Sequence, residues 1–185
     1  FFEFHGSATS VKEQSETVQE IAAGNGGGDF HWSTATEDRN KLWKARHNYY
    51  YAIKAKNPNH TFLVTDICVP ISNLAEMIDQ TAKEMKSKGM APSIMGHVGD
   101  GNFHSGIMVR PNNDDDINLA KDLTRRIVER ALELEGTCTG EHGVGIGKIE
   151  FMEKEHGEAY QVMSSIKKTF DPNGILNPGK VVKIN

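Results

Sequence analysis

Cysteine is scarce in this sequence, which has two cysteines, Cys68 and Cys138, among 185 residues. They lie far apart in the chain and neither belongs to a Cys-x-x-Cys pair, so the sequence offers neither a disulfide framework nor a thiolate metal site. A reducing compartment fits this cysteine usage best.

Long apolar runs and blocks of like charge are missing as well. No stretch approaches the roughly 20 apolar residues that span a bilayer, so we expect no membrane-spanning segment. The 25 acidic and 21 basic side chains are interspersed and give a formal net charge of −4, which does not favour a nucleic-acid partner. With 37% hydrophobic residues the composition is that of an ordinary soluble protein.

The chain begins at Phe1 rather than at a methionine. We expect that an N-terminal part has been lost, so a targeting peptide cannot be judged from this sequence. A mitochondrial and a cytoplasmic location therefore both stay open.

Hydrophobic periodicity and turn residues predict an α+β protein. Strands are expected over 1–5, 61–68, 92–97 and 103–110, and helices over about 10–24, 36–55, 72–88 and 114–135, with a last helix that ends near Phe170. The first helix is expected to start at Ser10, where Ser10 and Glu13 form a capping-box pattern. We expect one domain over 1–185, with a small antiparallel sheet covered by helices.

Two histidines flank a short glycine-rich connection. Gly99-Asp100-Gly101-Asn102 is short enough for a tight hairpin with His97 on one strand and His104 near the start of the next. On one continuous strand their odd spacing would put them on opposite faces, whereas a reversal lets the two rings converge. Such a pair begins a zinc-type site, which usually has a third protein ligand when it is catalytic. The alternative is that both rings only decorate a polar turn.

The third ligand has a candidate in TGEHGVG over 139–145. Adjacent residues of an extended loop point in opposite directions, so Glu141 can face a metal while His142 faces a substrate on the other side. A His, His, Glu triad leaves coordination positions open for substrate or water. The alternative is a glycine-rich loop that caps the following helix, with Glu141 near its positive end.

Several words of this sequence together resemble one flavoprotein family. They are FEFHG over 2–6, LWKARH over 42–47, TDICVP over 65–70, GHVGDGNFH over 96–104, TGEHGVG over 139–145, and FDP and LNPGK after residue 169. These words are similar to the C-terminal part of the FAD-dependent D-lactate dehydrogenases, in the vanillyl-alcohol-oxidase type flavoprotein superfamily. The resemblance implies a ferredoxin-like, FAD-linked oxidase C-terminal domain over 1–185.

The resemblance also implies a division of roles. His97, His104 and Glu141 would bind a divalent metal, zinc or manganese, and His142 would be the catalytic base beside the flavin. A 2-hydroxy acid that chelates the metal has a more acidic hydroxyl, whose proton an imidazole can remove at neutral pH. Hydride transfer to FAD then turns D-lactate into pyruvate.

Two further residues match positions of the family. Arg46 matches the arginine that pairs with the substrate carboxylate, although from the residues alone it is typical of a surface position on an amphipathic helix. Asn177 matches a position near the flavin, and is equally typical of a turn before Pro178.

Departures from the family pattern bear on the substrate. Relatives that act on D-2-hydroxyglutarate carry a lysine where this chain has Val64 and an asparagine where it has Gly106. Without those polar anchors, a short aliphatic 2-hydroxy acid such as D-lactate is favoured over one with a second carboxylate.

The N-terminal FAD-binding domain of the family lies outside this sequence. We therefore expect the chain alone to be inactive, with the missing domain, a small 2-hydroxy acid and an electron acceptor of unknown identity as its partners. The alternatives are a dehydrogenase of another D-2-hydroxy acid, glycolate or 2-hydroxyglutarate, and a non-catalytic metal-binding module of the same fold.

Overall fold

The structure is a computed structural model that describes residues 1–183. It divides into two units, Phe1–Ile53 and Lys54–Asn185, which we describe separately. The expectation of one domain over the whole chain stays a prediction.

The first unit contains α1 (Ala8–Gly24) and α2 (Thr36–His47), and α3 (Tyr49–Lys56) crosses its boundary. None of the residues 1–53 is buried, so this unit has no hydrophobic core of its own. The predicted strand over 1–5 is wrong, because no strand among the described residues pairs with that segment.

Two predicted helix boundaries in this region are also wrong. The N-cap of α1 is Ser7, whose hydroxyl accepts a hydrogen bond from the backbone N–H of Ser10, so the helix begins before Ser10. The single helix expected over 36–55 is divided at Asn48, which caps α2 before α3 begins. Asparagine is a weak helix former, which makes Asn48 a suitable position for the break.

The second unit is built on an antiparallel sheet with β4 (Asn102–Val109) at its centre. On one side β4 pairs with β1 (Thr61–Val64) and β2 (Ile67–Cys68), and on the other with β3 (Ile94–His97). β1 and β2 keep one register against β4, so the predicted strand over 61–68 exists but is interrupted at Thr65 and Asp66.

The predicted hairpin between β3 and β4 is confirmed. Its connection holds the short 3-10 helix η1 (Val98–Asp100), followed by Gly101 with a φ of 73°. A Cβ at Gly101 would clash with the carbonyl oxygen of Val69, so both the backbone conformation and the space require glycine here.

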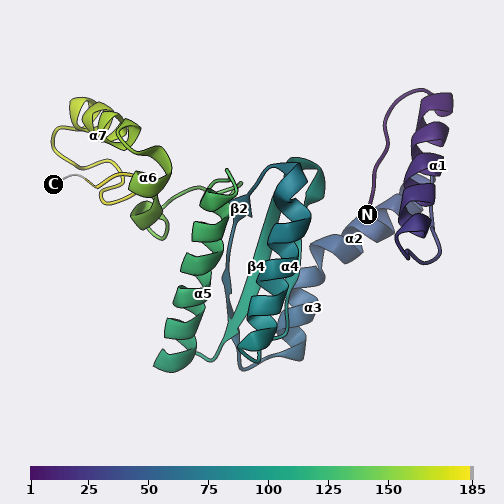
Figure 1. The fold of residues 1–185 in the computed structure, drawn as a ribbon, viewed down its shortest axis with the longest axis horizontal. Coiled ribbons are helices and arrows are strands. Elements are labelled where there is room, and N and C mark those ends of the chain that lie inside the picture. Colours follow the sequence, from purple (N-terminus) through teal and green to yellow (C-terminus); the bar gives the residue numbers. More distant parts are fainter. Residues whose placement is uncertain (184–185) are drawn as a thin grey trace. The chain divides into compact units, whose positions relative to one another are not determined.

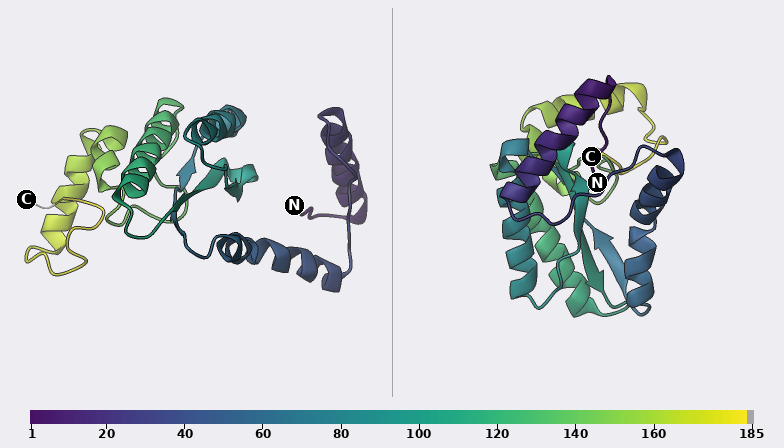
Figure 2. Two further views of the ribbon diagram at one scale, coloured as in Figure 1. Left: turned by 90° about the horizontal axis from the view of Figure 1, so that it is seen from below. Right: turned by 90° about the vertical axis from the view of Figure 1, so that its right-hand side faces the viewer.

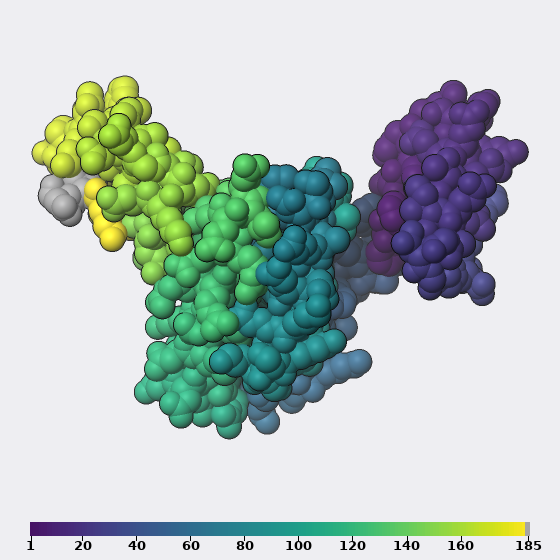
Figure 3. All heavy atoms as spheres, in the orientation of Figure 1, coloured from purple at the N-terminus to yellow at the C-terminus, as the bar shows by residue number. Residues whose placement is uncertain are grey.

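Two helices cover one face of this sheet. α4 (Ile71–Ser87) and α5 (Asp114–Glu133) lie side by side along β4, as Figures 1 and 2 show, and their side chains meet in Figure 3. Alternate residues of β4 point into the interface, and Phe103, Ile107 and Val109 are at most 2% exposed. Glu84 of α4 ties the two helices together, because its carboxylate forms an ion pair with Arg126 and accepts a hydrogen bond from Arg130 of α5.

The last two helices of the described residues are α6 (Ile149–His156) and α7 (Ala159–Phe170), which replace the single last helix expected from the sequence. Gly157 interrupts the helix with a φ of 52°, which only glycine adopts readily. Phe151, Met152 and Tyr160 join these helices to the core around Phe103.

The predicted fold class, an α+β protein with helices against an antiparallel sheet, is confirmed. Among the described residues, none of the helices combines the length and apolar character needed to cross a bilayer.

We expect Leu123→Ala to destabilise the protein. Leu123 of α5 has no exposed surface and packs against Ile107 and Val109, so the truncation leaves a cavity that costs roughly 2–5 kcal/mol of unfolding free energy. Urea unfolding checks this, with Leu176→Ala as control because the Leu176 side chain is largely exposed. Equal losses for the two variants would contradict the assigned core.

Candidate functional site

The face of the sheet opposite α4 and α5 carries the two predicted histidines. Asn102 and His104 alternate along β4 with the core residues, so their side chains point away from the face that α4 and α5 cover. His97 of β3 lies directly opposite Asn102 in the register. The hairpin therefore brings the rings of His97 and His104 together, with their centroids 6.4 Å apart and their planes at 86°.

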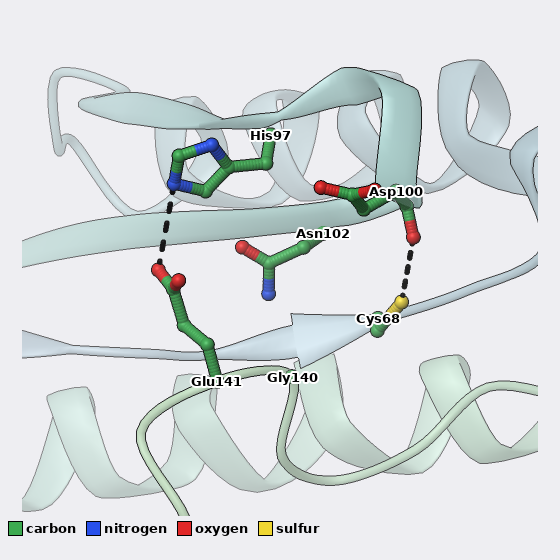
Figure 4. Close-up of a pocket in the computed structure, with 6 residues that line it drawn as sticks. All are labelled: Cys68, His97, Asp100, Asn102, Gly140 and Glu141. Atoms are coloured by element: carbon green, nitrogen blue, oxygen red, sulfur yellow. Dashed lines mark hydrogen bonds and ion pairs between the residues drawn. The ribbon is translucent and has the colours of Figure 1, made fainter.

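Glu141 completes the cluster from the loop that precedes α6. Its Oε1 lies 2.8 Å from Nε2 of His104 and 3.7 Å from Nε2 of His97, and Figure 4 shows His97 and Glu141 facing each other. The three potential ligand atoms all lie within 4.8 Å of one another. Two imidazole nitrogens and a carboxylate oxygen at this separation suit a divalent cation.

The hydrogen bonds of His104 provide a test of that fit. Nδ1 lies 3.3 Å from the carbonyl oxygen of Thr65, while Nε2 lies 2.8 Å from the carboxylate of Glu141. A neutral imidazole carries one N–H, yet both ring nitrogens face oxygen acceptors. A cation held by Nε2 and Glu141 removes the conflict, because Nδ1–H then donates to Thr65 as the outer hydrogen bond of a ligating histidine.

His142 lies in the same cluster. Its ring stacks on that of His104, with centroids 4.7 Å apart and planes within 3°, and its Nε2 lies 3.8 Å from Oε1 of Glu141. The expectation that Glu141 and His142 point to opposite sides of an extended loop is therefore wrong. The backbone curves at these residues, so both side chains approach His104.

The curvature has a physical cause in the buried carboxylate of Asp66. Asp66 is 1% exposed and lies between β1 and β2, across from His104. Its carboxylate accepts hydrogen bonds from the backbone N–H groups of the loop at 2.8–3.1 Å, which come from Gly140, Glu141 and His142. Further donors are the side chains of Thr139, Asn102 and Lys148.

These donors decide the charge state of Asp66. Burial by itself raises the pKa of the carboxyl group, but the N–H groups of His142 and Glu141, the Asn102 amide and the Lys148 ammonium outweigh it and hold the pKa well below its usual range. Asp66 is therefore an anion at neutral pH. Since its oxygens are already occupied by donors, it supports the site rather than ligating a cation.

Gly140 is needed for this close approach. A Cβ at this position would clash with the side-chain nitrogen of Asn102 and press on Asp66, so a larger residue would lift the loop from the sheet. The glycine allows Glu141 and His142 to lie directly over β4.

Cys68 and Asp100 line the opposite end of the pocket that contains His97, Asn102 and Glu141 (Figure 4). Burial, with the charges of Asp100 and Asp66, raises the pKa of the Cys68 thiol. The thiol therefore stays protonated, and it donates to the carbonyl oxygen of Asp100 at 3.0 Å. Cys68 lines the pocket and is not a thiolate ligand.

The other two predicted site residues lie elsewhere in the chain. Arg46 is on α2 of the first unit, whereas the histidines belong to the second unit. Asn177 has a φ of 47°, and its side-chain oxygen accepts a hydrogen bond from Lys180, as in a turn. The roles of both toward substrate and flavin stay predictions.

Sequence reasoning missed two residues of the site, Asp66 and Asn102. Asp66 carried a signal, because Thr65 and Asp66 are polar residues between the apolar residues 62–64 and Ile67 of the predicted strand. Asn102 stood within the hairpin connection without a distinguishing mark, since asparagine is common in turns.

Comparison with known proteins decides the family. Residues 1–181 match the family described as FAD linked oxidases, C-terminal domain. The chain belongs to this family. The match covers both units, and the histidine hairpin and the loop bearing Glu141 and His142 lie within it.

Curated relatives of this FAD-linked oxidase C-terminal domain align with nearly the whole of this chain. "Probable D-lactate dehydrogenase, mitochondrial" of Danio rerio is 45% identical over 100% of this chain and 37% of the relative. "D-lactate dehydrogenase (cytochrome), mitochondrial" of Arabidopsis thaliana is 44% identical over 98% of this chain and 32% of the relative. A glycolate oxidase subunit of Bacillus subtilis is 31% identical over 95% of this chain and 37% of the relative. The chain thus spans about a third of the length of these relatives.

Replacement of Asp66 tests its supporting role. We expect Asp66→Asn to lower the unfolding free energy of the metal-free protein at pH 7 by about 3–5 kcal/mol, because Lys148 and the loop N–H groups lose their anion. Folding favours the ionised carboxylate, so this stabilisation is full above the ordinary pKa of 3.8 and is lost as the pH falls toward the lower folded value.

The difference between the wild type and Asp66→Asn should therefore narrow below about pH 4. Urea unfolding of both proteins between pH 3 and 7 measures it, with EDTA present throughout. A difference that stays constant over this range would contradict the ionised state of Asp66.

Proposed function

We propose that this chain is the substrate- and metal-binding part of a flavin-dependent dehydrogenase that oxidises D-lactate to pyruvate. The observation that carries the proposal is the convergence of His97, His104 and Glu141 with His142 stacked beside them. Three ligands and one further imidazole match what the oxidation of a 2-hydroxy acid requires. The names of the relatives from zebrafish and Arabidopsis support D-lactate as the substrate.

The proposed cation is zinc or manganese, held by Nε2 of His97, Nε2 of His104 and Oε1 of Glu141. When bound, it would polarise the substrate hydroxyl and make it more acidic. The chain contributes the geometry of this site. Thr65 orients the His104 ring through its carbonyl oxygen, and Asp66 holds the loop that carries Glu141.

His142 is the proposed base. Its ring is held by stacking on His104, and its backbone N–H is fixed by Asp66 at 2.8 Å. The side chain is half exposed, so its Nε2 is accessible to a substrate hydroxyl. A neutral imidazole in this place accepts the hydroxyl proton as the hydride leaves the substrate carbon.

FAD, when bound, would supply the redox chemistry as the acceptor of the hydride. We place its main binding site in the part of the relatives that this chain does not span, with Asn177 as a contact from this chain. Arg46 is proposed to pair with the substrate carboxylate through its planar guanidinium group.

The preference for a small substrate rests on two residues near the triad. Val64 of β1 and Gly106 of β4 lie directly opposite each other in the register, two positions from Asp66 and His104 respectively. Neither offers a charge or a hydrogen-bonding side chain to a second carboxylate. A substrate panel of D-lactate, glycolate and D-2-hydroxyglutarate on the full-length protein separates the three candidates, and a preference for the diacid would overturn this assignment.

Location and electron acceptor follow the relatives in this proposal. The Arabidopsis relative is named as a mitochondrial D-lactate dehydrogenase (cytochrome), which supports a mitochondrial location and a cytochrome as acceptor. A non-catalytic metal-binding module of the same fold is the competing reading, and it predicts metal binding without turnover.

Removal of any one metal ligand should abolish tight metal binding. We expect His97→Ala, His104→Ala and Glu141→Gln in the full-length protein each to weaken binding by roughly 100-fold or more, since even outer hydrogen-bond partners of ligands cost 10–100-fold. Titration with Zn²⁺ and Mn²⁺ measures this, with the exposed residues His31→Ala and Glu153→Gln as matched controls. Unchanged stoichiometric metal in all three variants would remove the metal site from the proposal.

His142→Ala should separate chemistry from metal binding. We expect turnover of D-lactate by the full-length enzyme to fall roughly 100-fold or more, as for loss of a general base, while metal affinity changes less than about tenfold. Steady-state kinetics and metal titration on the same preparation provide the measurement. Normal turnover would exclude His142 as the base.

A further inference from the structure

Asn102 brings a buried oxygen atom to the pocket without a partner. The residue is 5% exposed, and its side-chain Oδ1 lacks a hydrogen-bond partner among the described residues 1–183. Of the buried polar side-chain atoms that share this condition, only this one belongs to a residue lining the pocket with His97 and Glu141. A buried carbonyl oxygen without a partner is costly, so a ligand is expected to supply one.

The orientation of the Asn102 amide is determined by its neighbours. Nδ2 donates to Oδ1 of Asp66 at 3.0 Å and to the carbonyl oxygen of Ile67 at 2.9 Å. The carbonyl oxygen of Ile67 has no hydrogen to give, and the Asp66 carboxylate already accepts hydrogen bonds from the backbone N–H groups of Gly140 and His142, so both partners act as acceptors. A flipped amide would place an oxygen against two oxygens, so Nδ2 faces these acceptors and Oδ1 points away from them.

The position of Oδ1 relates it to the proposed metal ligands. Asn102 is the cross-strand partner of His97 and stands two residues before His104 on the same face of β4. Figure 4 shows the amide oxygen turned toward the side of the pocket where His97 and Glu141 lie, away from Cys68. Four potential ligand atoms, two nitrogens and two oxygens, thus border one space.

The charge of a group bound in the pocket decides whether Oδ1 attracts or repels it. A carbonyl oxygen repels the carboxylate of a hydroxy acid and the alkoxide that forms from it, and it attracts a cation. Backbone and asparagine carbonyls are common ligands of hard divalent ions.

We propose that Oδ1 of Asn102 is a fourth protein ligand of the divalent cation, beside His97, His104 and Glu141. This inference rests on the metal site of the proposed function and adds a residue to it. The ligand set becomes two imidazoles, one carboxylate and one carbonyl, which shifts the site toward a hard cation of high coordination number.

Mn²⁺ and Zn²⁺ should differ in how much of their affinity depends on the Asn102 oxygen. Zn²⁺ is satisfied by three protein ligands and one further ligand, whereas Mn²⁺ favours a larger set of oxygen donors. Loss of the Asn102 oxygen should therefore weaken Mn²⁺ more than Zn²⁺. A general folding defect would weaken both metals alike, so the ratio of the two affinities is the informative quantity.

The test uses Asn102→Ala in the full-length protein, titrated with Mn²⁺ alone and with Zn²⁺ alone in competition with a chelator. Thr139→Val is the matched control, because it also removes one hydrogen bond to Asp66 but leaves the Asn102 oxygen in place. If Asn102→Ala does not fold, Asn102→Ser takes its place. The serine hydroxyl can still donate a hydrogen bond on the Asp66 side, but the serine side chain is too short to bring its oxygen to the pocket.

We expect the Asn102 variant to bind Mn²⁺ at least tenfold more weakly than the wild type does, with a loss of Zn²⁺ affinity that is fivefold smaller. The ratio of the two metal affinities in Thr139→Val should equal that of the wild type. An unchanged ratio in the Asn102 variant overturns the proposal. If His97→Ala and Glu141→Gln lose metal while the Asn102 variant does not, only this inference fails. If the wild type binds neither metal, the metal site of the proposed function fails with it.

Discussion

The carboxylate of Asp66 is the point at which the sheet and the loop bearing Glu141 and His142 are joined. It lies in the sheet, is fully buried, and accepts hydrogen bonds from successive backbone N–H groups of a loop about 75 positions further along the chain. A buried anion requires such donors, and a loop that donates them has to curve around it. This one interaction places two site residues above His104.

The two faces of the sheet divide the work of the second unit. One face carries apolar residues of β4 and packs on α4 and α5. The opposite face carries Asn102 and His104, and the loop with Glu141 lies over it. Because the side chains of one strand alternate between these faces, the core fixes the direction in which the site residues point.

Much of this arrangement was accessible from the sequence. The helix stripes and the hairpin around Gly99–Asn102 follow from periodicity, spacing and glycine-rich turns. Glu141 was a candidate third ligand from its loop, and the family resemblance favoured it over a role in capping the following helix. The helix breaks at Asn48 and Gly157 were missed because neither residue excludes a continuous helix locally. The strand over 1–5 was predicted from apolar residues, but a strand also needs a partner, which local sequence does not reveal.

The sequence by itself determined which chemical groups are present and which of them are close in the chain: two histidines on a hairpin and a glutamate beside a histidine. Only the tertiary structure decided that Glu141 and His142 lie on the same side, and that the Asn102 oxygen faces the pocket. The physical reason is that both outcomes depend on the buried charge of Asp66, whose donors come from distant parts of the chain. Long-range hydrogen bonds of this kind leave no periodic pattern in the sequence.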